Sequence, residues 1–150
     1  MNRVRLATPA DIPALFAVRT SVRENHLDIA QLAERGVTPE SMAALLAGGQ
    51  SETWVAESEQ GIIGFSTADA RTGSISALFV SPGAERQGYG RVLQAAEEWL
   101  FGAGWETIGL QTGEEADNRA HAFYRAAGWI MAGPADHDDV RYEKSRPSTL

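Results

Sequence analysis

Cysteine is absent from the 150 residues of the chain, and histidine occurs only three times. The lack of cysteine excludes disulfide bonds, thiolate metal ligands and a cysteine nucleophile. The histidines are scattered along the sequence, so a histidine-based metal cluster is not expected either. The sequence therefore predicts no metal site.

Long apolar runs are missing as well. No segment approaches the roughly 20 consecutive apolar residues that cross a bilayer. The first five residues, MNRVR, lack the apolar core of a signal peptide. We therefore expect a soluble, cytoplasmic protein with no membrane partner.

Positive charge is scarce, because 13 Lys and Arg residues stand against 20 Asp and Glu residues, for a formal net charge of −7. Nucleic-acid-binding surfaces need clustered Lys and Arg to neutralise phosphates, so a nucleic-acid partner is not expected. The acidic balance suits a cationic partner such as an amine, although net charge reports mainly on solubility.

The length and the apolar content of 43% fit one domain with a single core. The sequence shows no internal repeat, low-complexity linker or shift in composition. We predict one domain over residues 1–150, with a mobile tail over residues 145–150.

Hydrophobic periodicity predicts an α+β domain with a mixed sheet of about seven strands and about four helices. Thr8 and Thr38 are predicted to cap the first two helices, which extend to about Val22 and to Gly48. In chain order, the expected strands cover residues 4–7, 54–56, 62–68, 74–80, 107–111, 129–132 and 140–144, and the later helices cover 92–100 and 117–127.

The most informative stretch follows the apolar run at residues 77–80. It breaks at Ser81-Pro82-Gly83 and leads through ERQGYGR, residues 85–91, into a helical pattern. Gly88 and Gly90 are predicted to form a turn with backbone dihedrals closed to other residues, which lets the backbone approach a ligand closely. The free N–H groups at the start of a helix favour an anion. The stretch therefore predicts a phosphate-bearing ligand.

Two common phosphate motifs do not match this stretch. A dinucleotide fingerprint needs a small residue where Leu93 stands, and a P-loop needs Gly-Lys-Ser/Thr where the chain has Gly90-Arg91-Val92. A tight turn with no ligand is the remaining alternative.

The stretch resembles the central signature of the GNAT superfamily of acyl-CoA-dependent N-acyltransferases. That signature is a strand ending in Val, a short loop, and Gln/Arg-x-x-Gly-x-Gly/Ala opening a helix; Val80, Pro82 and residues 86–91 fall in register with it. A second family signature, Asn-x-x-Ala-x-x-Phe-Tyr-x-x-x-Gly-Phe, resembles DNRAHAFYRAAGW at residues 117–129. The chain departs from the two patterns at Glu85 and at Asp117, with Asn118 next to it.

The resemblance implies the GNAT fold, with a sheet splayed in the middle, and transfer of an acetyl group from acetyl-CoA to a primary amine of a small molecule in a direct ternary complex. It implies that backbone groups of Leu78, Phe79 and Val80 bind the pantetheine arm, and that the Val80 N–H stabilises the oxyanion. The residues implied to bind the rest of the cofactor are Arg86, Gln87, Gly88, Tyr89, Gly90, Arg91, Asp117 and Asn118.

Tyr124 matches the family tyrosine that gives its proton to the CoA thiolate. Its alternative role is that of a core aromatic residue beside Phe123. For the arginines at 86 and 91 the alternative is ordinary solvated surface.

The resemblance places the acceptor over the first two helices. Arg19 and Arg23 lie four residues apart on one predicted helix face, where they suit a carboxylate-bearing acceptor. A basic last turn favoured by the helix dipole is the alternative. Glu24, Asn25 and His26 crowd the same helix end. The candidate bases are Glu52, Glu57, Asp69, Glu114 and Glu115, and a chain of waters is a further candidate.

Other functions stay open at this point. The acceptor can instead be a protein N-terminus, a lysine or a charged tRNA, although the acidic composition argues against the tRNA. A non-catalytic acyl-CoA-binding module is another alternative, indicated by Glu85 and Asp117. The apolar residues Trp129, Ile130 and Met131 fit either a homodimer contact, since family members often dimerise through late strands, or core.

Overall fold

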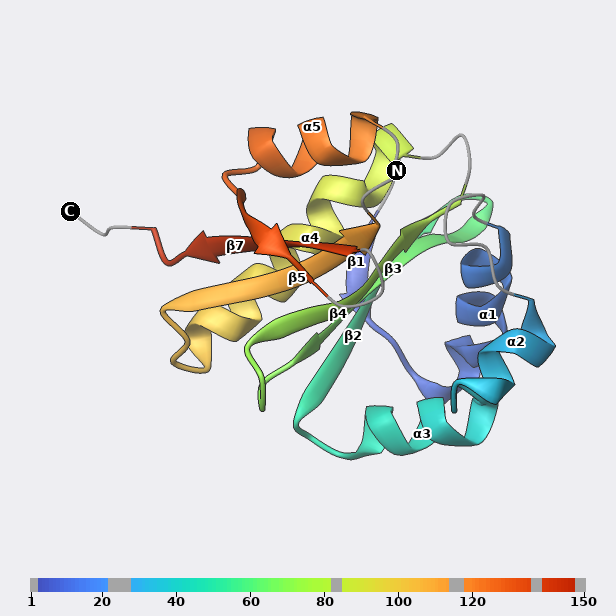
Figure 1. The fold of residues 1–150 in the computed structure, drawn as a ribbon. Coiled ribbons are helices and arrows are strands. Elements are labelled where there is room, and N and C mark those ends of the chain that lie inside the picture. Colours follow the sequence, from blue (N-terminus) through green and yellow to red (C-terminus); the bar gives the residue numbers. More distant parts are fainter. Residues whose placement is uncertain (1–2, 22–27, 82–84, 114–117, 136–138, 148–150) are drawn as a thin grey trace.

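A computed structural model describes residues 3–21, 28–81, 85–113, 118–135 and 139–147 of the chain, with the side chains at 85–89, 113 and 118–120 outside that description. Seven strands form one sheet in the order β1-β2-β3-β4-β5-β7-β6 (Figure 1). All neighbours are antiparallel except β4 and β5. The bounds are β1 Arg3–Leu6, β2 Ser51–Ser58, β3 Gly61–Asp69, β4 Ser74–Val80, β5 Thr107–Gly113, β6 Ile130–Pro134 and β7 Asp139–Ser145. The prediction of an α+β fold with a mixed, mostly antiparallel sheet is confirmed.

The helices cover the two faces of the sheet. On one face lie α1 (Ile12–Ser21), α2 (Ile29–Glu34) and α3 (Pro39–Ala47), and on the other α4 (Glu85–Gly102) and α5 (Asn118–Ala126) (Figure 1). Alternation along β2 shows the division: Val55 packs with Leu15 and Val18 of α1, whereas Trp54 packs with Leu93 of α4. The result is a three-layer domain whose two apolar layers meet the sheet from opposite sides.

The described part of the chain contains five α-helices, one more than the sequence predicted. The additional helix is α2, where Asp28 Oδ1 accepts a hydrogen bond from the Gln31 N–H at 2.8 Å and the Gln31 side chain accepts one from the Asp28 N–H. Leu32 is its one buried residue. A helix of six residues with a single buried side chain leaves no apolar periodicity to read.

Thr8 and Thr38 both stand at their predicted N-cap positions, but of the two only Thr38 makes the side-chain capping hydrogen bond. Thr38 Oγ1 accepts from the Ser41 N–H at 3.1 Å. The first helix begins with a short 3-10 turn, Pro9–Asp11, in which Asp11 Oδ2 accepts from the Thr8 N–H at 2.8 Å. Arg5 binds the same carboxylate with its Nη1 at 2.8 Å and Nη2 at 3.0 Å, and also binds Glu57 on β2 at 3.1 Å. This network ties the start of the first helix to the edge of the sheet.

The start of α4 differs from the prediction. The helix begins at Glu85, so Gly88 and Gly90 lie inside its first turns and form no separate turn before it. Gly90 does not have a positive φ, so the dihedrals expected of it are wrong. Gly88 and Gly90, which were predicted to form a turn, are therefore part of the helix.

Glu97 joins α4 to the last part of the sheet. Its carboxylate accepts hydrogen bonds from Trp129 Nε1 at 3.0 Å and from Lys144 Nζ on β7 at 2.7 Å. Lys144 also donates to the carbonyl of Ala127, just after α5, at 2.8 Å. A buried acidic residue is thereby satisfied by Trp129, just before β6, and by Lys144 on β7.

The last residues of the described chain remain paired. Ser145 pairs with Thr107, and the Arg146 N–H donates to the Glu106 carbonyl at 2.7 Å. These two residues are the first two of the predicted tail, residues 145–150. Trp129 belongs to the core, whereas Ile130 and Met131 are exposed on the edge strand β6. The homodimer prediction therefore rests on these two side chains.

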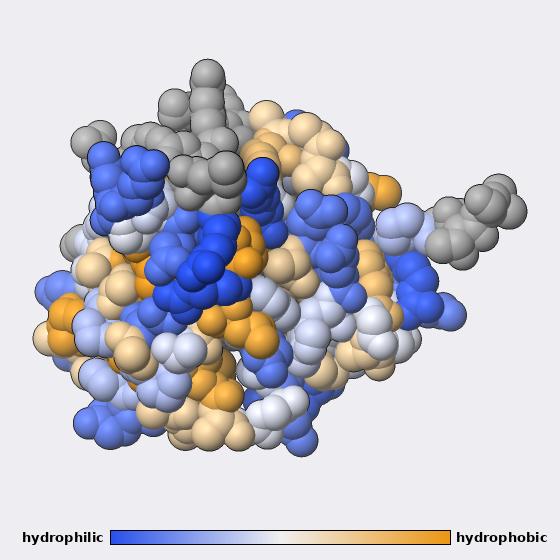
Figure 2. Space-filling model, turned by 180° about the vertical axis from the view of Figure 1, so that it is seen from behind, coloured by the Kyte–Doolittle hydropathy of each residue, from blue (hydrophilic) through white to orange (hydrophobic). Residues whose placement is uncertain are grey.

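No helix in the described ranges is both long and apolar enough to span a membrane. From behind, apolar residues on the surface are interrupted by hydrophilic ones (Figure 2).

Candidate functional site

The sheet opens between its two parallel strands. Within the described residues, β4 and β5 pair only at Ser74 with Gly109 and at Ile75 with Leu110. Beyond Ile75, within the described ladder, β4 continues to Val80 with β3 as its one strand neighbour. A gap between the two parallel strands therefore follows the first residues of β4.

The hydrogen-bond alternation of β4 decides which of its backbone groups face this gap. The Ser81 N–H donates to the Ile63 carbonyl at 2.8 Å, and paired residues in an antiparallel ladder alternate between bonded and non-bonded. Phe79, which pairs with Phe65, therefore turns its N–H and C=O towards β3. Leu78 and Val80 turn theirs towards the gap. This corrects the expectation that all three residues offer backbone groups there.

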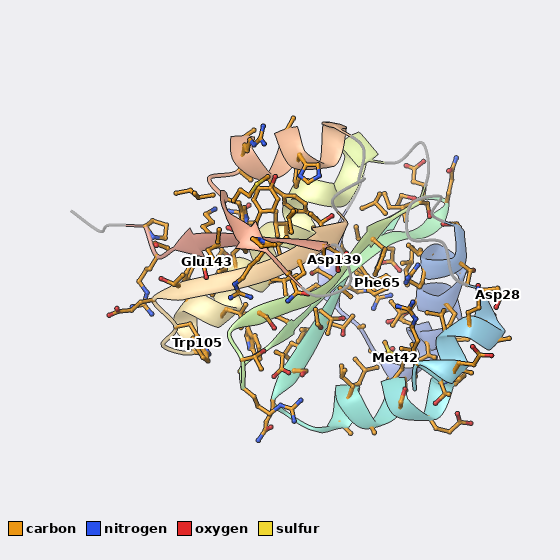
Figure 3. All side chains as sticks on the ribbon, viewed as in Figure 1. Asp28, Met42, Phe65, Trp105, Asp139 and Glu143 are labelled. Atoms are coloured by element: carbon orange, nitrogen blue, oxygen red, sulfur yellow. The ribbon has the colours of Figure 1, made fainter. Side chains whose placement is uncertain are left out.

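The side chains of β4 divide between the two faces of the sheet. Val80 is buried and packs with Val92 of α4, and Leu78 packs beside them. Phe79 points to the opposite face and contacts Phe65, with ring centroids 5.7 Å apart. Figure 3 shows Phe65 and Met42 in the layer between the sheet and the helices α1 to α3. The gap thus borders both apolar layers.

The helix α4 follows β4 after Ser81 and three residues outside the description. The first N–H groups of an α-helix have no partner within it and carry the positive end of its dipole. A Cβ built on Gly90 meets no atom within 4 Å, so this side of the helix is open. An anion can therefore approach the backbone closely here.

The charged candidates near this helix start are only partly described. The side chains of Arg86, Gln87 and Tyr89 lie outside the described residues, as does that of Glu85. Arg91 is exposed and borders a shallow hollow of about 300 Å³ between α4 and β1, together with Val4, Gln94, Ala95 and Glu98. Arg91 therefore lies on the side of α4 that faces β1.

Tyr124 lies buried among aromatic side chains on α5. Its ring centroid is 5.5 Å from that of Tyr142 on β7 and 5.7 Å from that of Phe123. The Tyr142 hydroxyl and His121 Nδ1 lie 2.6 Å apart, which gives the fully buried Tyr142 a hydrogen-bond partner. The phenol ring of Tyr124 is thus held by packing, as both the catalytic and the core interpretation require.

Several other predicted site residues lie outside the described residues. On the cofactor side these are Asp117 and the side chain of Asn118, and on the acceptor side Arg23, Glu24, Asn25 and His26. Arg19 is described: its guanidinium carbon lies 4.3 Å from the centroid of the Phe79 ring. Burial, and then repulsion from Arg35, lower the pKa of Arg19 from its usual value.

Two of the candidate bases are held by arginines. Glu57 binds Arg3 at 3.0 Å and Arg5 at 3.1 Å, and Asp69 binds Arg71 at 3.2 Å. These hydrogen bonds, the one from Arg5 first for Glu57, lower the pKa of both carboxyl groups. A carboxylate stabilised in its ionised form is a poor proton acceptor near neutral pH.

Glu52 lies at the end of the sheet that is far from Val80. It pairs with Ala68, which pairs with Ile75, at the opposite end of β4 from Val80. At about 3.3 Å per residue, five residues of strand separate them by roughly 17 Å. Glu114 and Glu115 lie outside the described residues.

A model of the acetyltransferase (GNAT) family matches residues 20–129 of the chain. The protein belongs to the GNAT family. The matched span contains β4 and β5, which border the gap, as well as the start of α4 and Tyr124. The strands that border the gap thus lie within the part of the chain that matches the family. The protein is an acetyltransferase of this family.

Solved GNAT structures share the fold over nearly the whole chain. The PaiA N-acetyltransferase of Thermoplasma acidophilum, solved with coenzyme A, is 16% identical with a TM-score of 0.78, over 97% of this chain and 99% of its own. A GNAT-family acetyltransferase of Staphylococcus aureus Mu50 is 15% identical with a TM-score of 0.77, over 97% and 99%. Nourseothricin acetyltransferase is 17% identical with a TM-score of 0.70, over 97% and 99%. No match was found among curated proteins.

Sequence reasoning missed two features of the described structure. Arg35 ends α2, a helix that the periodicity did not indicate. The contact between His121 and Tyr142 joins residues 21 positions apart, and no local pattern relates them. The one available signal for this contact was Tyr142, because it falls within the strand predicted over residues 140–144.

Proposed function

We propose that the protein transfers the acetyl group of acetyl-CoA to the primary amine of a small molecule, by direct attack in a ternary complex. The observation that carries this proposal is the gap between β4 and β5, towards which Leu78 and Val80 turn their backbone groups. Acetyl-CoA supplies the activated acetyl thioester. The absence of cysteine excludes an acyl-cysteine intermediate.

The described residues fit this cofactor in two ways. Amides of a pantetheine arm can complete the hydrogen bonds of Leu78 and Val80 that β5 does not make. A pyrophosphate can reach the first turns of α4, where Gly90 leaves open space. In the proposal, Arg86, Gln87, Gly88, Tyr89 and Arg91 surround the pyrophosphate, and Asp117 or Asn118 touches the cofactor.

The proposed chemistry needs few groups from the protein. The Val80 N–H donates to the carbonyl oxygen on which negative charge develops, and the gap holds the two reactants together. Tyr124 then gives its phenolic proton to the departing sulfur, since a phenol ordinarily keeps its proton at neutral pH. Because arginines hold Glu57 and Asp69, water or the Glu114-Glu115 pair takes the amine proton.

The acceptor is proposed to be small because two of the structural neighbours are named for small molecules. Nourseothricin acetyltransferase is the named example among those compared above. The formal charge of −7 favours a cationic amine over a nucleic acid.

Calorimetry with acetyl-CoA, followed by release of free thiol against a panel of amines, tests the proposal. Binding together with thiol release from a small amine supports it. Binding without release from any small amine, lysine or peptide N-terminus indicates a non-catalytic module. Release from a peptide alone indicates the protein-acetylating alternative.

Two glycines of α4 give a matched test of the cofactor position. A Cβ at Gly90 or at Gly102 meets nothing within 4 Å, and neither glycine has a positive φ. Gly90→Leu is expected to raise the Kd for acetyl-CoA at least tenfold, about 1.4 kcal/mol, because its side chain occupies the space of the ligand. Gly102→Leu, at the other end of the helix, is the control. Equal affinities in the two variants would contradict the proposed position.

A further inference from the structure

One face of β5 and β7 is left open by the helices. Val140 and Tyr142 of β7 pack in the core cluster on the α4 side of the sheet. Because successive strand residues point to opposite faces, Asp139, Arg141 and Glu143 lie on the other face. Figure 1 shows this face towards the reader, with α4 behind β5 and β7 and none of the described helices in front of them. A small molecule can therefore reach the two strands from this side.

The register places Asp139 beside the open part of the gap. The last described pair between β4 and β5 joins Ile75 and Leu110. Three residues further on, β4 reaches Leu78, which turns its backbone groups towards the gap, and β5 reaches Gly113. Asp139 of β7 pairs with Gly113, so two strand spacings, roughly 10 Å, and the opening itself separate it from β4. Asp139 thus lies across the gap from the strand that is proposed to bind the thioester.

The strand between Asp139 and the gap carries few side chains on this face. Opposite the three charged residues of β7, β5 presents Gly109, Gln111 and Gly113, and two of these have no side chain. Arg141 shows the consequence, because a Cβ built on Gly109 would collide with its guanidinium. A side chain of β7 can therefore extend over β5 towards β4, and Gly113 leaves the same room beside Asp139.

The Asp139 carboxylate has no hydrogen-bond or ion-pair partner within the described residues. Arg141, on the same face, donates from Nε to Glu143 at 3.1 Å and lies over Gly109, which pairs with Glu143. Glu143 and Asp139 lie towards opposite ends of β7 (Figure 3), so the guanidinium is directed away from Asp139. The Asp139 carbonyl accepts from the Ala135 N–H at 2.7 Å, which fixes the backbone. A half-buried carboxylate on a fixed backbone suits a cationic ligand.

We propose that Asp139 binds the acceptor as its ammonium ion, so that the enzyme prefers alkylamines, which are charged at neutral pH, to arylamines, which are not. The inference rests on the proposed function and specifies the substrate class of the same site. The carboxylate accepts hydrogen bonds from the ammonium and holds its nitrogen on the open face, across the gap from Leu78 and Val80.

The reaction at this nitrogen is balanced without a base on the protein. The nitrogen forms a bond to the acetyl carbon as the carbon–sulfur bond breaks. Of the two protons that the ammonium nitrogen loses, one is released to water. The other replaces, through water, the proton that Tyr124 gives to the sulfur. Asp139 therefore acts by binding and orienting the amine.

Amines of different charge test this inference. Benzylamine, phenethylamine and cadaverine are charged at neutral pH, whereas aniline is neutral. We expect kcat/KM to be higher for at least one of the three alkylamines than for aniline. Asp139→Asn, which keeps the size of the side chain and removes its charge, should lower kcat/KM for that alkylamine about 10- to 100-fold, mainly through KM. The KM for acetyl-CoA and the rate with aniline should stay unchanged.

Two further variants make the test specific. Glu143→Gln is the matched control, because it removes a carboxylate from the same face of the same strand and its amide oxygen can still accept from Arg141 Nε. It should leave kcat/KM for the alkylamine unchanged. Asp139→Glu keeps the charge on a longer side chain and should retain part of the preference. Added salt should lower kcat/KM for the alkylamine more in the native protein than in Asp139→Asn.

Equal kcat/KM values for every alkylamine in Asp139→Asn and Glu143→Gln would overturn the inference. A loss in Asp139→Asn that extends equally to aniline, or to the KM for acetyl-CoA, would also overturn it, because it would indicate a structural role only. A preference of the native protein for aniline over all three alkylamines would do the same. Failure of the proposed function gives a different result, since no amine would then release thiol.

Discussion

Lys144→Met tests the ion pair that joins α4 to β7. Lys144 Nζ lies 2.7 Å from Glu97 Oε1 and 2.8 Å from the Ala127 carbonyl, and Trp129 Nε1 lies 3.0 Å from Glu97 Oε2. The side chains of Glu97 and Lys144 are 9% and 19% exposed, so water compensates little for a lost partner. The variant leaves a buried carboxylate with Trp129 as its described donor.

The expected loss follows from this burial. Removing one partner of a buried pair costs about 3–5 kcal/mol, because the remaining charge is uncompensated. For a chain of this length, each 1 kcal/mol moves Tm by about 2–4 °C, so Tm should fall by roughly 10 °C. The double variant Glu97→Gln with Lys144→Met should be more stable than Lys144→Met alone, since it removes the unpaired charge.

Urea unfolding followed by circular dichroism measures these free energies. Arg141→Met is the control on the same strand, because Arg141 and Glu143 form an exposed pair, 38% and 43% exposed, that contributes about 0–1 kcal/mol. Added salt should change the control more than Lys144→Met. A loss below about 1 kcal/mol for Lys144→Met, equal to that of Arg141→Met, would refute the reasoning.

Two further outcomes are expected. Arg5 hydrogen bonds lower the pKa of Asp11 from 3.8 to about 2, so Asp11 contributes stability that is present above pH 3.8 and is lost as the pH falls towards 2. That contribution is about 2 kcal/mol, and Asp11→Asn should flatten this part of a urea-unfolding series measured against pH; an unchanged slope would count against the ion pair. Tyr124→Phe should lower kcat at least tenfold with acetyl-CoA affinity unchanged, because it removes the proton donor and keeps the ring. Full turnover of this variant in the thiol-release assay would remove Tyr124 from the mechanism.

Local chemistry was enough to predict most elements of the fold. The Thr38 cap and the alternation of β2, β3 and β4 arise from neighbouring residues, so a single sequence reveals them. The helix α2 was not predicted because its one buried residue, Leu32, makes no periodic apolar stripe. The start of α4 was placed too late because Gly88 and Gly90 ordinarily indicate a turn, whereas a helix tolerates them at a modest cost.

The sequence predicted which strand borders the site, but it did not predict which residues of that strand face the gap. The motif around Val80 indicated which strand borders the cofactor, but the choice between Leu78 and Phe79 depends on the register with β3. The repulsion by which Arg35 lowers the pKa of Arg19 depends on how α2 packs, which is a tertiary property. Trp129 was predicted as either a homodimer contact or core, and its buried hydrogen bond to Glu97 lies in the core.

The brief pairing of β4 with β5 also affects how long the protein survives in a cell. Only two residue pairs connect the strands on either side of the gap, so the two parts of the sheet rely on the packing of α4 to stay together. A cofactor bound in the gap would bridge them, and a ligand at 100 times its Kd adds about 2.7 kcal/mol to stability. The abundance of the enzyme would then follow the supply of acetyl-CoA, since proteases degrade the open form first.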